Sequence, residues 1–329
     1  MIKIPEKINM ANLPTKIEKM EKLSKKLGGP DIYIKRDDQT GTEISGNKIR
    51  KLEFSAAEAA DKGYDTLITC GGIQSNHCRA TAAVAVKLGF KCCLVLNGSK
   101  DTEVDGNLLL DKLLGAEIYF VSQEEYENRR MEVMKEIKTN MKNKGLKPYI
   151  IPEGASNGIG GFGYYRAIEE IMLQEKEMKV HFDGIVIATG SGGTYSGLLL
   201  GSRILNYDTK IYGVNVCHDE KYFKGRIYEI LHNSMSYMNV NLNFSKDEIN
   251  IIDGYVGRGY ALSREEELEF IKELAKLEGI ILDPVYTGKA MYGLTQEIKK
   301  GKFSEYKNLL FIHTGGIFGI FPQKSQFRV

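Results

Sequence analysis

Residues 33–50, YIKRDDQTGTEISGNKIR, decide how the chain is organised. The segment begins with β-prone residues, continues with four consecutive charges at 35–38 and a Gly/Thr/Ser turn, and reaches Lys48 directly behind Gly46 and Asn47. The apolar spacing of Leu52, Phe54 and the following alanines predicts a helix, so Lys48 lies where a turn becomes a helix. A lysine partly desolvated there can lose its proton near neutral pH, and a neutral amine can condense with a carbonyl. The alternative is a surface lysine that caps the helix.

Length and composition are those of a globular protein with room for two hydrophobic cores. The chain has 329 residues, of which 42% are hydrophobic and 27% charged, and its net charge is +2. The charges are dispersed and no apolar run is long enough to span a bilayer, so we expect neither nucleic acid nor membrane as a partner. The cysteines are odd in number and form no CxxC pair, which predicts reduced thiols, no metal site and a cytoplasmic location. They stand at positions 70, 78, 92, 93 and 217.

Strand-like and helix-like segments alternate along almost the whole chain. The segments expected to form strands are 66–70, 91–96, 117–121, 149–152, 183–189, 210–216 and 308–313. Helical patterns separate most of them, and a glycine-rich loop is expected at 154–163. This alternation predicts an α/β fold built from parallel βαβ units.

The turn at 190–194 has the composition of an anion site. It follows the most strongly apolar strand and consists of Gly190, Ser191, Gly192, Gly193 and Thr194. Glycines let the backbone approach a ligand, and the free N–H groups at the start of the next helix suit a phosphate. The lysine and the longer spacing of a Walker A motif are absent, which disfavours a nucleoside triphosphate.

Three further loops, at 71–77, 286–288 and 314–316, also follow predicted strands. Because ligands of doubly wound folds lie at the carboxyl ends of the strands, these loops are expected to converge with Lys48 on one cleft. The glycines at 158, 160 and 163 match the dinucleotide-binding spacing formally. No acidic residue ends a second strand where that motif requires it, so we interpret them as close packing.

Six motifs together resemble the pyridoxal-phosphate enzymes of the tryptophan-synthase-β type (fold type II). Within that group the chain is similar to the D-cysteine desulfhydrase and 1-aminocyclopropane-1-carboxylate deaminase family. The motifs are KRDDQTG at 35–41, GNKIRKLEF at 46–54, GGIQSNHCRATAA at 71–83, GSGGTYSG at 190–197, DPVYTGKAMYGL at 283–294 and FIHTGG at 311–316. The resemblance implies two α/β domains, each an open, mostly parallel sheet flanked by helices. Residues 1–48 and 152–329 would form the large domain, and 49–151 the small inserted one.

The resemblance also implies how pyridoxal 5'-phosphate would be held. Lys48 would bind the cofactor covalently and shuttle the α-proton of the substrate. Lys51, one helical turn further on, would reach the phosphate that residues 190–194 cradle. Asn76 would hydrogen-bond the ring hydroxyl oxygen, and Thr314 would face the pyridine nitrogen.

The substrate would be bordered by the loop after the first strand of the small domain and by two tyrosines. Ser75 and Asn76 would bind its carboxylate side together with His77, although a lone histidine in that position is more often a hydrogen-bonded structural residue. Tyr260 and Tyr286 would also border the substrate. Lys48, Ser75 and the two tyrosines are the expected catalytic residues, and a homodimer is expected.

The reaction implied is α,β-elimination, most simply D-cysteine to pyruvate, ammonia and sulfide. The deaminase has a glutamate where this chain has Thr287, and a neutral partner for the ring nitrogen favours prompt loss of a β-substituent. Deamination of 1-aminocyclopropane-1-carboxylate and elimination from another β-substituted alanine, such as cysteate, stay open. So does a non-catalytic pyridoxal-phosphate- or dinucleotide-binding protein.

Overall fold

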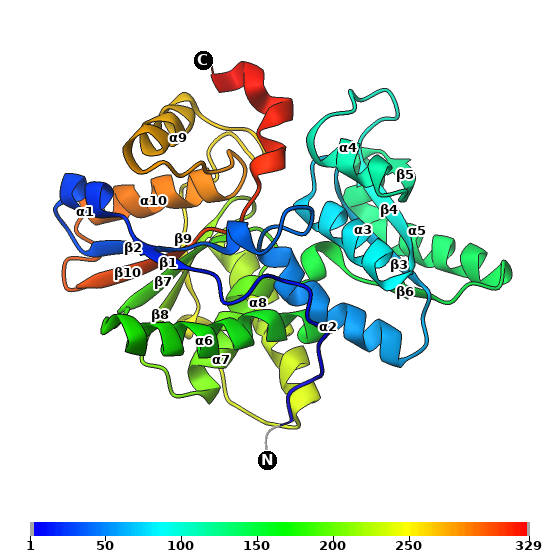
Figure 1. Cartoon of the computed structure of the whole chain (residues 1–329), viewed down its shortest axis with the longest axis horizontal. Helices are drawn as coiled ribbons and strands as arrows, with labels where there is room; N and C mark the ends of the chain where they lie inside the picture. The colour runs from blue at the N-terminus through cyan, green and yellow to red at the C-terminus, as the bar shows by residue number, and fades with distance from the viewer. Residues whose placement is uncertain (1–2, 328–329) are drawn as a thin grey trace.

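The computed structural model describes residues 3–327 and divides their strands between two sheets (Figure 1). The first sheet has the order β1-β2-β10-β7-β8-β9, and all neighbouring strands pair in parallel except β1 with β2. The second has the order β5-β4-β3-β6 and is parallel throughout. Two mostly parallel sheets flanked by helices confirm the predicted fold class. The strands of the first sheet are β1 (Ile17–Lys19), β2 (Asp31–Lys35), β7 (Gly184–Thr189), β8 (Lys210–Asn215), β9 (Asn250–Ile252) and β10 (Asn308–Ile312).

Helices cover both faces of the first sheet because its strands are apolar on both sides. Alternate residues of β7 point to opposite faces: Ile185 and Ile187 join one core cluster, whereas Val186 and Ala188 join the other. The first cluster packs under α6 (Gly158–Met178), α7 (Gly193–Ile204) and α8 (Glu220–Met238). The second packs under α1 (Glu21–Leu27), α9 (Glu265–Glu278) and α10 (Thr287–Lys299), on the opposite side of the sheet in Figure 1.

The second sheet is covered in the same way. Its strands are β3 (Thr66–Gly72), β4 (Lys91–Asn97), β5 (Glu117–Val121) and β6 (Pro148–Ile150). One face packs against α2 (Asn47–Asp61), α3 (Asn76–Leu88) and α4 (Gly106–Leu113), and the other against α5 (Gln123–Asn143). Helix α2 also sends Phe54 into the core of the first sheet, where it meets Phe162 of α6. The predicted domain boundaries at 48/49 and 151/152 stay a prediction.

The glycine-rich segment at 154–163 differs from the loop that was expected there. Helix α6 begins at Gly158 and takes in the remaining glycines. A Cβ on Gly163 would lie 2.4 Å from the carbonyl oxygen of Arg50 on α2. Gly163 therefore allows α6 to approach α2 closely, and Gly158 and Gly161 allow the same toward Asn233 and Ser234 of α8. These glycines serve close packing, as the sequence interpretation proposed.

None of the helices in residues 3–327 combines the length and the apolar composition of a membrane span. The five cysteines are free, and four of them are buried.

Two of the four charges at 35–38, Lys35 and Asp37, form a buried network that fixes α2. Asp37, fully buried, accepts hydrogen bonds from Thr15 Oγ1 at 2.8 Å and from the Nε and Nη2 of Arg50 at 2.9 and 2.8 Å. Arg50 also donates to Glu170 Oε2 at 2.9 Å, and Lys35 Nζ donates to Glu170 Oε1 at 2.7 Å. Burying these charges is tolerable only because each one has a partner. The network joins β2, α2 and α6 two residues from Lys48.

Replacing Asp37 with alanine should lower the free energy of unfolding by about 3–5 kcal/mol, since Arg50 would then be a buried charge without its main partner. The matched control is Asp31→Ala, because Asp31 pairs with Lys19 Nζ at 2.8 Å but its side chain is 42% exposed. That loss should stay within about 1 kcal/mol. Denaturant titration followed by circular dichroism measures both. Equal losses in the two variants would contradict the importance of the buried network.

Candidate active site

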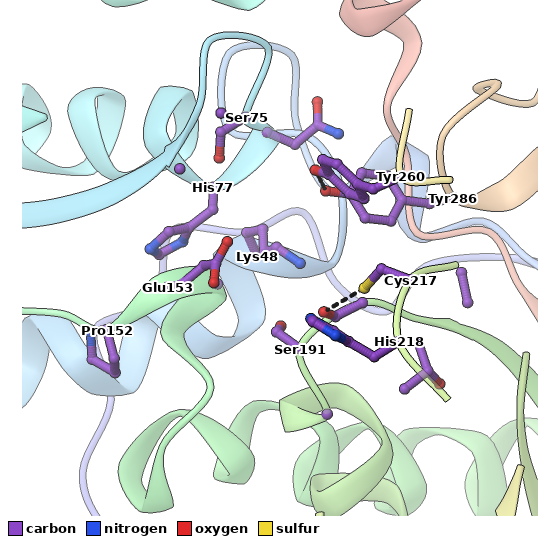
Figure 2. Close-up of a pocket in the computed structure, with 18 of the residues that line it drawn as sticks. Lys48, Ser75, His77, Pro152, Glu153, Ser191, Cys217, His218, Tyr260 and Tyr286 are labelled. Carbon is purple, nitrogen blue, oxygen red and sulfur yellow. Dashed lines mark hydrogen bonds between the residues drawn. The ribbon is translucent and has the colours of Figure 1, made fainter. Parts of the chain in front are cut away.

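A cavity of about 880 Å³ opens at the carboxyl ends of the parallel strands of both sheets (Figure 2). The segments that follow β3, β7, β8 and β10 line it, as the switch-point rule for α/β folds requires. Most of the residues predicted for the site meet there: Lys48, Ser75, Asn76, His77, Gly190, Ser191, Gly192, Thr194, Tyr260, Tyr286 and Thr314 line the cavity. Lys51 and Gly193 are buried behind this surface.

Lys48 is the second residue of α2, and the turn before it is pinned to two strand ends. Gly46 has a φ of 101°, and a Cβ there would lie 2.7 Å from the carbonyl oxygen of Thr314. Asn47 donates its backbone N–H to the same oxygen at 3.1 Å and its Nδ2 to Thr194 Oγ1 at 3.0 Å. Only glycine permits so close an approach at this φ. The turn thus holds the base of the Lys48 side chain rigidly between β10 and the 190–194 loop.

The surroundings of Lys48 make its amine unusually easy to deprotonate. Burial lowers the pKa of Lys48 to about 8, although the carboxylates of Glu153 and Asp283 act in the opposite direction. Figure 2 shows the side chain in the middle of the cavity, with Ser75 and Ser191 on opposite sides of it. A substantial part of the amine is therefore neutral, and hence nucleophilic, near neutral pH.

Lys51 is a fully buried lysine whose surroundings lack a compensating charge. Its Nζ donates to Ser156 Oγ at 3.3 Å, and that hydroxyl lies 2.7 Å from Ser191 Oγ. Burial, reinforced by Lys48, lowers the pKa of Lys51 well below its ordinary value. Within residues 3–327, no carboxylate lies within ion-pair distance of it. Two lysines and several hydroxyls, with no carboxylate paired to Lys51, make a site that suits an anion.

The 190–194 loop completes this anion site. Gly192, with a φ of 84°, is the N-cap of α7, and the helix starts at Gly193. The free N–H groups of the first turn and the helix dipole therefore point toward the hydroxyls of Ser191 and Ser156. The residues present fit the phosphate of pyridoxal 5'-phosphate, and Lys48 lies one helical turn from Lys51, within reach of the same ligand.

The loop after β3 presents a second set of donors. Ser75 is the N-cap of α3, and its Oγ accepts from Cys78 N at 3.2 Å. Asn76 Oδ1 accepts from Asn107 Nδ2 of α4 at 3.0 Å, so the amide presents its NH₂ group as the donor to a ligand. Sequence reasoning missed both Asn107 and Asn47. The only local signal at either position was an asparagine beside a glycine.

His77 is tied into the structure as well as lining the cavity. Its Nε2 lies 2.8 Å from Thr69 Oγ1, and that hydroxyl donates its proton to the carbonyl oxygen of Ile151 at 2.8 Å. The network therefore assigns the ring proton to Nε2 and leaves Nδ1 as an acceptor. Burial and the nearby lysines, Lys48 first, lower the pKa of His77 well below its ordinary value, so the ring is neutral. Its role toward the substrate stays a prediction.

The two predicted tyrosines form a pair at the cavity. The hydroxyls of Tyr260 and Tyr286 are hydrogen-bonded, and their rings meet edge to face with centroids 5.9 Å apart. Tyr286 is the N-cap of α10, whereas Tyr260 comes from the loop between β9 and α9. Burial raises the pKa of Tyr286 well above its ordinary value, so its hydroxyl stays protonated.

The side chain that Thr314 contributes is a neutral hydroxyl group. Thr314 is buried at the end of β10, and the two residues that follow it are glycines with positive φ angles. Thr287 lies outside the cavity lining, because its Oγ1 donates to Asp283 Oδ1 at 2.6 Å and helps to start α10. The carboxylates that line the cavity, Glu127 and Glu153, come from α5 and the segment after β6. They belong to the side of the cleft formed by the second sheet.

Comparison with known proteins agrees with this geometry. The family model "Pyridoxal-phosphate dependent enzyme" matches residues 8–315. The bifunctional D-cysteine desulfhydrase/1-aminocyclopropane-1-carboxylate deaminase of Arabidopsis thaliana is 44% identical over 97% of this chain and 80% of its own. The D-cysteine desulfhydrase of Yersinia pestis is 39% identical over 97% of this chain and 96% of its own. The crystal structure of an ACC deaminase homologue superposes with a TM-score of 0.91 at 39% identity, covering 99% of this chain and 96% of the other.

Proposed function

The chain belongs to the family of pyridoxal-phosphate-dependent enzymes, and from this premise we propose that it catalyses α,β-elimination on D-cysteine. The products are pyruvate, ammonia and sulfide. The observation that supports this most strongly is the Lys48 amine, with a pKa of about 8, at the centre of a cavity that also holds an anion site and a tyrosine pair.

In this reaction some residues of the chain bind the ligands, and Lys48 transfers one proton. When bound, pyridoxal phosphate supplies an aldehyde that reacts with amines and a ring that withdraws electrons from the substrate α-carbon. Lys51 and residues 190–194 hold the phosphate, and Asn76 donates to the ring hydroxyl oxygen. The released Lys48 amine takes the α-proton, since its lowered pKa leaves it partly unprotonated at neutral pH.

Ser75 and the start of α3 bind the substrate carboxylate. The Ser75 hydroxyl caps the helix, and the first N–H groups of α3 carry the positive end of its dipole. Helix α3 has 13 residues, which is long enough for that dipole to develop. The carboxylate then lies on the side of the cavity opposite the tyrosine pair, which orients the β-substituent toward Tyr260 and Tyr286.

The tyrosine pair orients the leaving sulfur atom and is not required to protonate it. The C–S bond breaks with its electrons passing to sulfur, so the leaving group is hydrosulfide, and its conjugate acid is a stronger acid than a cysteine thiol (pKa about 8.5) or an ordinary tyrosine (about 10). Proton transfer from tyrosine to hydrosulfide is therefore unfavourable, and more so here because the pKa of Tyr286 is raised. The 2-aminoacrylate product hydrolyses to pyruvate and ammonia.

Deamination of 1-aminocyclopropane-1-carboxylate is the second candidate, because relatives carry both activities in their names. The side of the cavity at Thr314 argues against it. Opening a ring without a β-leaving group needs a strong electron sink, and a protonated pyridine nitrogen beside a carboxylate provides one. Thr314 offers a neutral hydroxyl, and the threonine at 287 is bonded to Asp283.

The test is product formation from a panel of amino acids with the purified, cofactor-loaded protein. D-cysteine should give pyruvate and sulfide in equal amounts and faster than L-cysteine, cysteate or β-chloroalanine. 1-Aminocyclopropane-1-carboxylate should give little 2-oxobutanoate. Faster turnover of the cyclopropane than of D-cysteine would assign the deaminase reaction instead, and absence of any keto-acid product would leave a binding protein.

The rate at which the cofactor-free protein reacts with pyridoxal phosphate should rise with pH through about 8. At pH 7.5 an amine with a pKa of 8 is about one quarter neutral, against about one part in a thousand for an ordinary lysine with a pKa near 10.5. Because the neutral form is the nucleophile, the rate should level off above pH 9. Stopped-flow absorbance measures this profile. A rate that keeps rising tenfold per pH unit to pH 10 would contradict the lowered pKa.

We propose a cytoplasmic homodimer as the working state. The free cysteines suit a reducing compartment. Helix α4 contacts the segment 317–319, and these neighbours expose several large apolar side chains, among them Leu113 at 73% and Ile317 at 43%. Such a patch suits an isologous contact between two copies. Sedimentation should give twice the mass of one chain, and Leu113→Asp should shift it toward the monomer. A monomeric wild-type protein would contradict the proposal.

A further inference from the structure

Lys289 is a buried lysine that no step of the proposed reaction uses. It lies on the first turn of α10, and its side chain is completely buried. Its Nζ donates to three backbone carbonyl oxygens, those of Val256 at 2.5 Å, Gly259 at 2.7 Å and Leu262 at 3.0 Å. An ammonium group has three N–H donors, and each one has an acceptor here.

All three acceptors belong to the loop that carries Tyr260. The loop backbone is in the left-handed region at Gly257 (φ 69°), Gly259 (φ 133°) and Ala261 (φ 59°). Its own apolar side chains add little packing, since Tyr260 is 47% and Leu262 51% exposed. A non-glycine residue in this region costs energy that neighbouring contacts must offset. The Lys289 ammonium is the contact on which the three carbonyls converge.

The same helix therefore sets both tyrosines. Tyr286 is the N-cap of α10, three residues before Lys289. Through Lys289 the helix also fixes the 256–262 loop, and the hydroxyls of Tyr260 and Tyr286 meet in a hydrogen bond. Without the ammonium, the three carbonyl oxygens would face one another with no donor between them, which disfavours this loop conformation.

We propose that Lys289 is a positioning residue of the elimination reaction: its ammonium gathers the carbonyls of the 256–262 loop and thereby places Tyr260 against Tyr286. This role rests on the proposed function, in which the tyrosine pair orients the β-substituent. Lys289 itself touches neither the cofactor nor the substrate.

The first test compares Lys289→Met with Lys300→Met. Lys300 is the matched control, because it follows the end of the same helix and its side chain is 66% exposed. Its Nζ donates to Tyr255 and Glu297, neither of which belongs to the 256–262 loop. Lys289→Met should lower kcat by about 10²-fold, the cost of misplacing a positioning group by roughly 1 Å. The visible absorbance of the bound cofactor should remain, and hydrogen exchange should quicken in peptides covering 256–262. Lys300→Met should change none of these. In a Tyr260→Phe background, Lys289→Met should cause little further loss of kcat.

The second test restores the cation from solution. Lys289→Ala leaves the three carbonyls around a small cavity, and potassium, ammonium or methylammonium ions should enter it. They should raise kcat and slow the hydrogen exchange of the loop, whereas none of the three ions should affect Lys300→Met. If the alanine variant does not fold, Lys289→Gln, which keeps two N–H donors, replaces it and should lose less kcat than Lys289→Met.

Two results would overturn the proposal: a folded Lys289→Met protein whose loop exchanges as in the wild type, whatever its activity, or one whose kcat stays within twofold of the wild type. If the hydrogen exchange of the loop quickens in Lys289→Ala and none of the added cations slows it, the role of the charge is overturned. Hydrogen exchange measures the protection of the loop backbone and requires no substrate. If the wild type turns over no amino acid, the proposed function fails while the exchange result still decides whether Lys289 holds the loop.

Discussion

Replacing Lys48 with alanine should abolish turnover and the visible absorbance that covalently bound pyridoxal phosphate gives. In the proposed function the amine is both the point of attachment and the base for the α-proton, so one substitution should remove two functions. A loss of about 10⁴-fold or more in kcat is expected. The cofactor should still bind, but weakly and reversibly, because the anion site around Lys51 and the 190–194 loop remains in place.

The control for this variant is Lys62→Ala, since Lys62 stands at the end of the same helix with its side chain 53% exposed. It should keep the absorbance, kcat and stability of the wild type within small margins. Addition of methylamine to Lys48→Ala should restore part of the turnover by supplying a free amine. A Lys48→Ala protein that retains the coloured adduct after dialysis would contradict the assignment of the attachment site.

Replacing Lys51 with methionine should produce two effects of opposite sign. In the cofactor-free protein the substitution removes a buried, unpaired amine, and the free energy of unfolding should rise by about 1 kcal/mol or more. Cofactor binding, in contrast, should weaken by about 10²- to 10³-fold, because a buried charge-assisted contact to a phosphate contributes about 2–5 kcal/mol. A residue kept for structural reasons alone would not separate the two measurements in this way.

Pyridoxal, which lacks the phosphate, makes this prediction specific to the anion site. The wild type should bind pyridoxal phosphate far more tightly than pyridoxal, and Lys51→Met should lose most of that preference while its affinity for pyridoxal changes little. Lys62→Met serves as the exposed control on the same helix. An unchanged preference in Lys51→Met would contradict the phosphate site proposed between Lys51, Ser156 and Ser191.

The fold class and the convergence of the loops could be predicted because they follow from local pattern. The apolar strand 183–189 and the glycine turn after it are readable from adjacent residues, and the structure has β7 at Gly184–Thr189 followed by α7. Strand ends of one parallel sheet necessarily meet at one edge, so the loops at 190–194 and 314–316, which follow β7 and β10, had to share a cleft. The loop at 71–77 follows β3 of the second sheet, and its arrival at the same cleft depends on how the two sheets pack. The resemblance of the motifs to a known family then gave the cofactor.

The residues that orient the site could not be predicted, because their partners are distant in sequence. Asn107 reaches Asn76 across 31 positions, and Lys289 reaches Val256 across 33. The start of α6 at Gly158 was missed for a related reason. Glycine disfavours helices locally, and only the close contacts of Gly163 with α2 and of Gly158 and Gly161 with α8 show why glycine stands there. The helix or strand propensity of neighbouring residues contains no information about such tertiary contacts.

Lys48 is proposed to be the one lysine that carries the cofactor. Cofactor-saturated protein is reduced with borohydride, digested and analysed by mass spectrometry, which locates the pyridoxyl group on a peptide without any assumption about substrate or rate. The account predicts one modified residue, Lys48, in the peptide that contains residues 46–50. A pyridoxyl group on Lys51 or on any other amine in place of Lys48, or no modification at all, would contradict it.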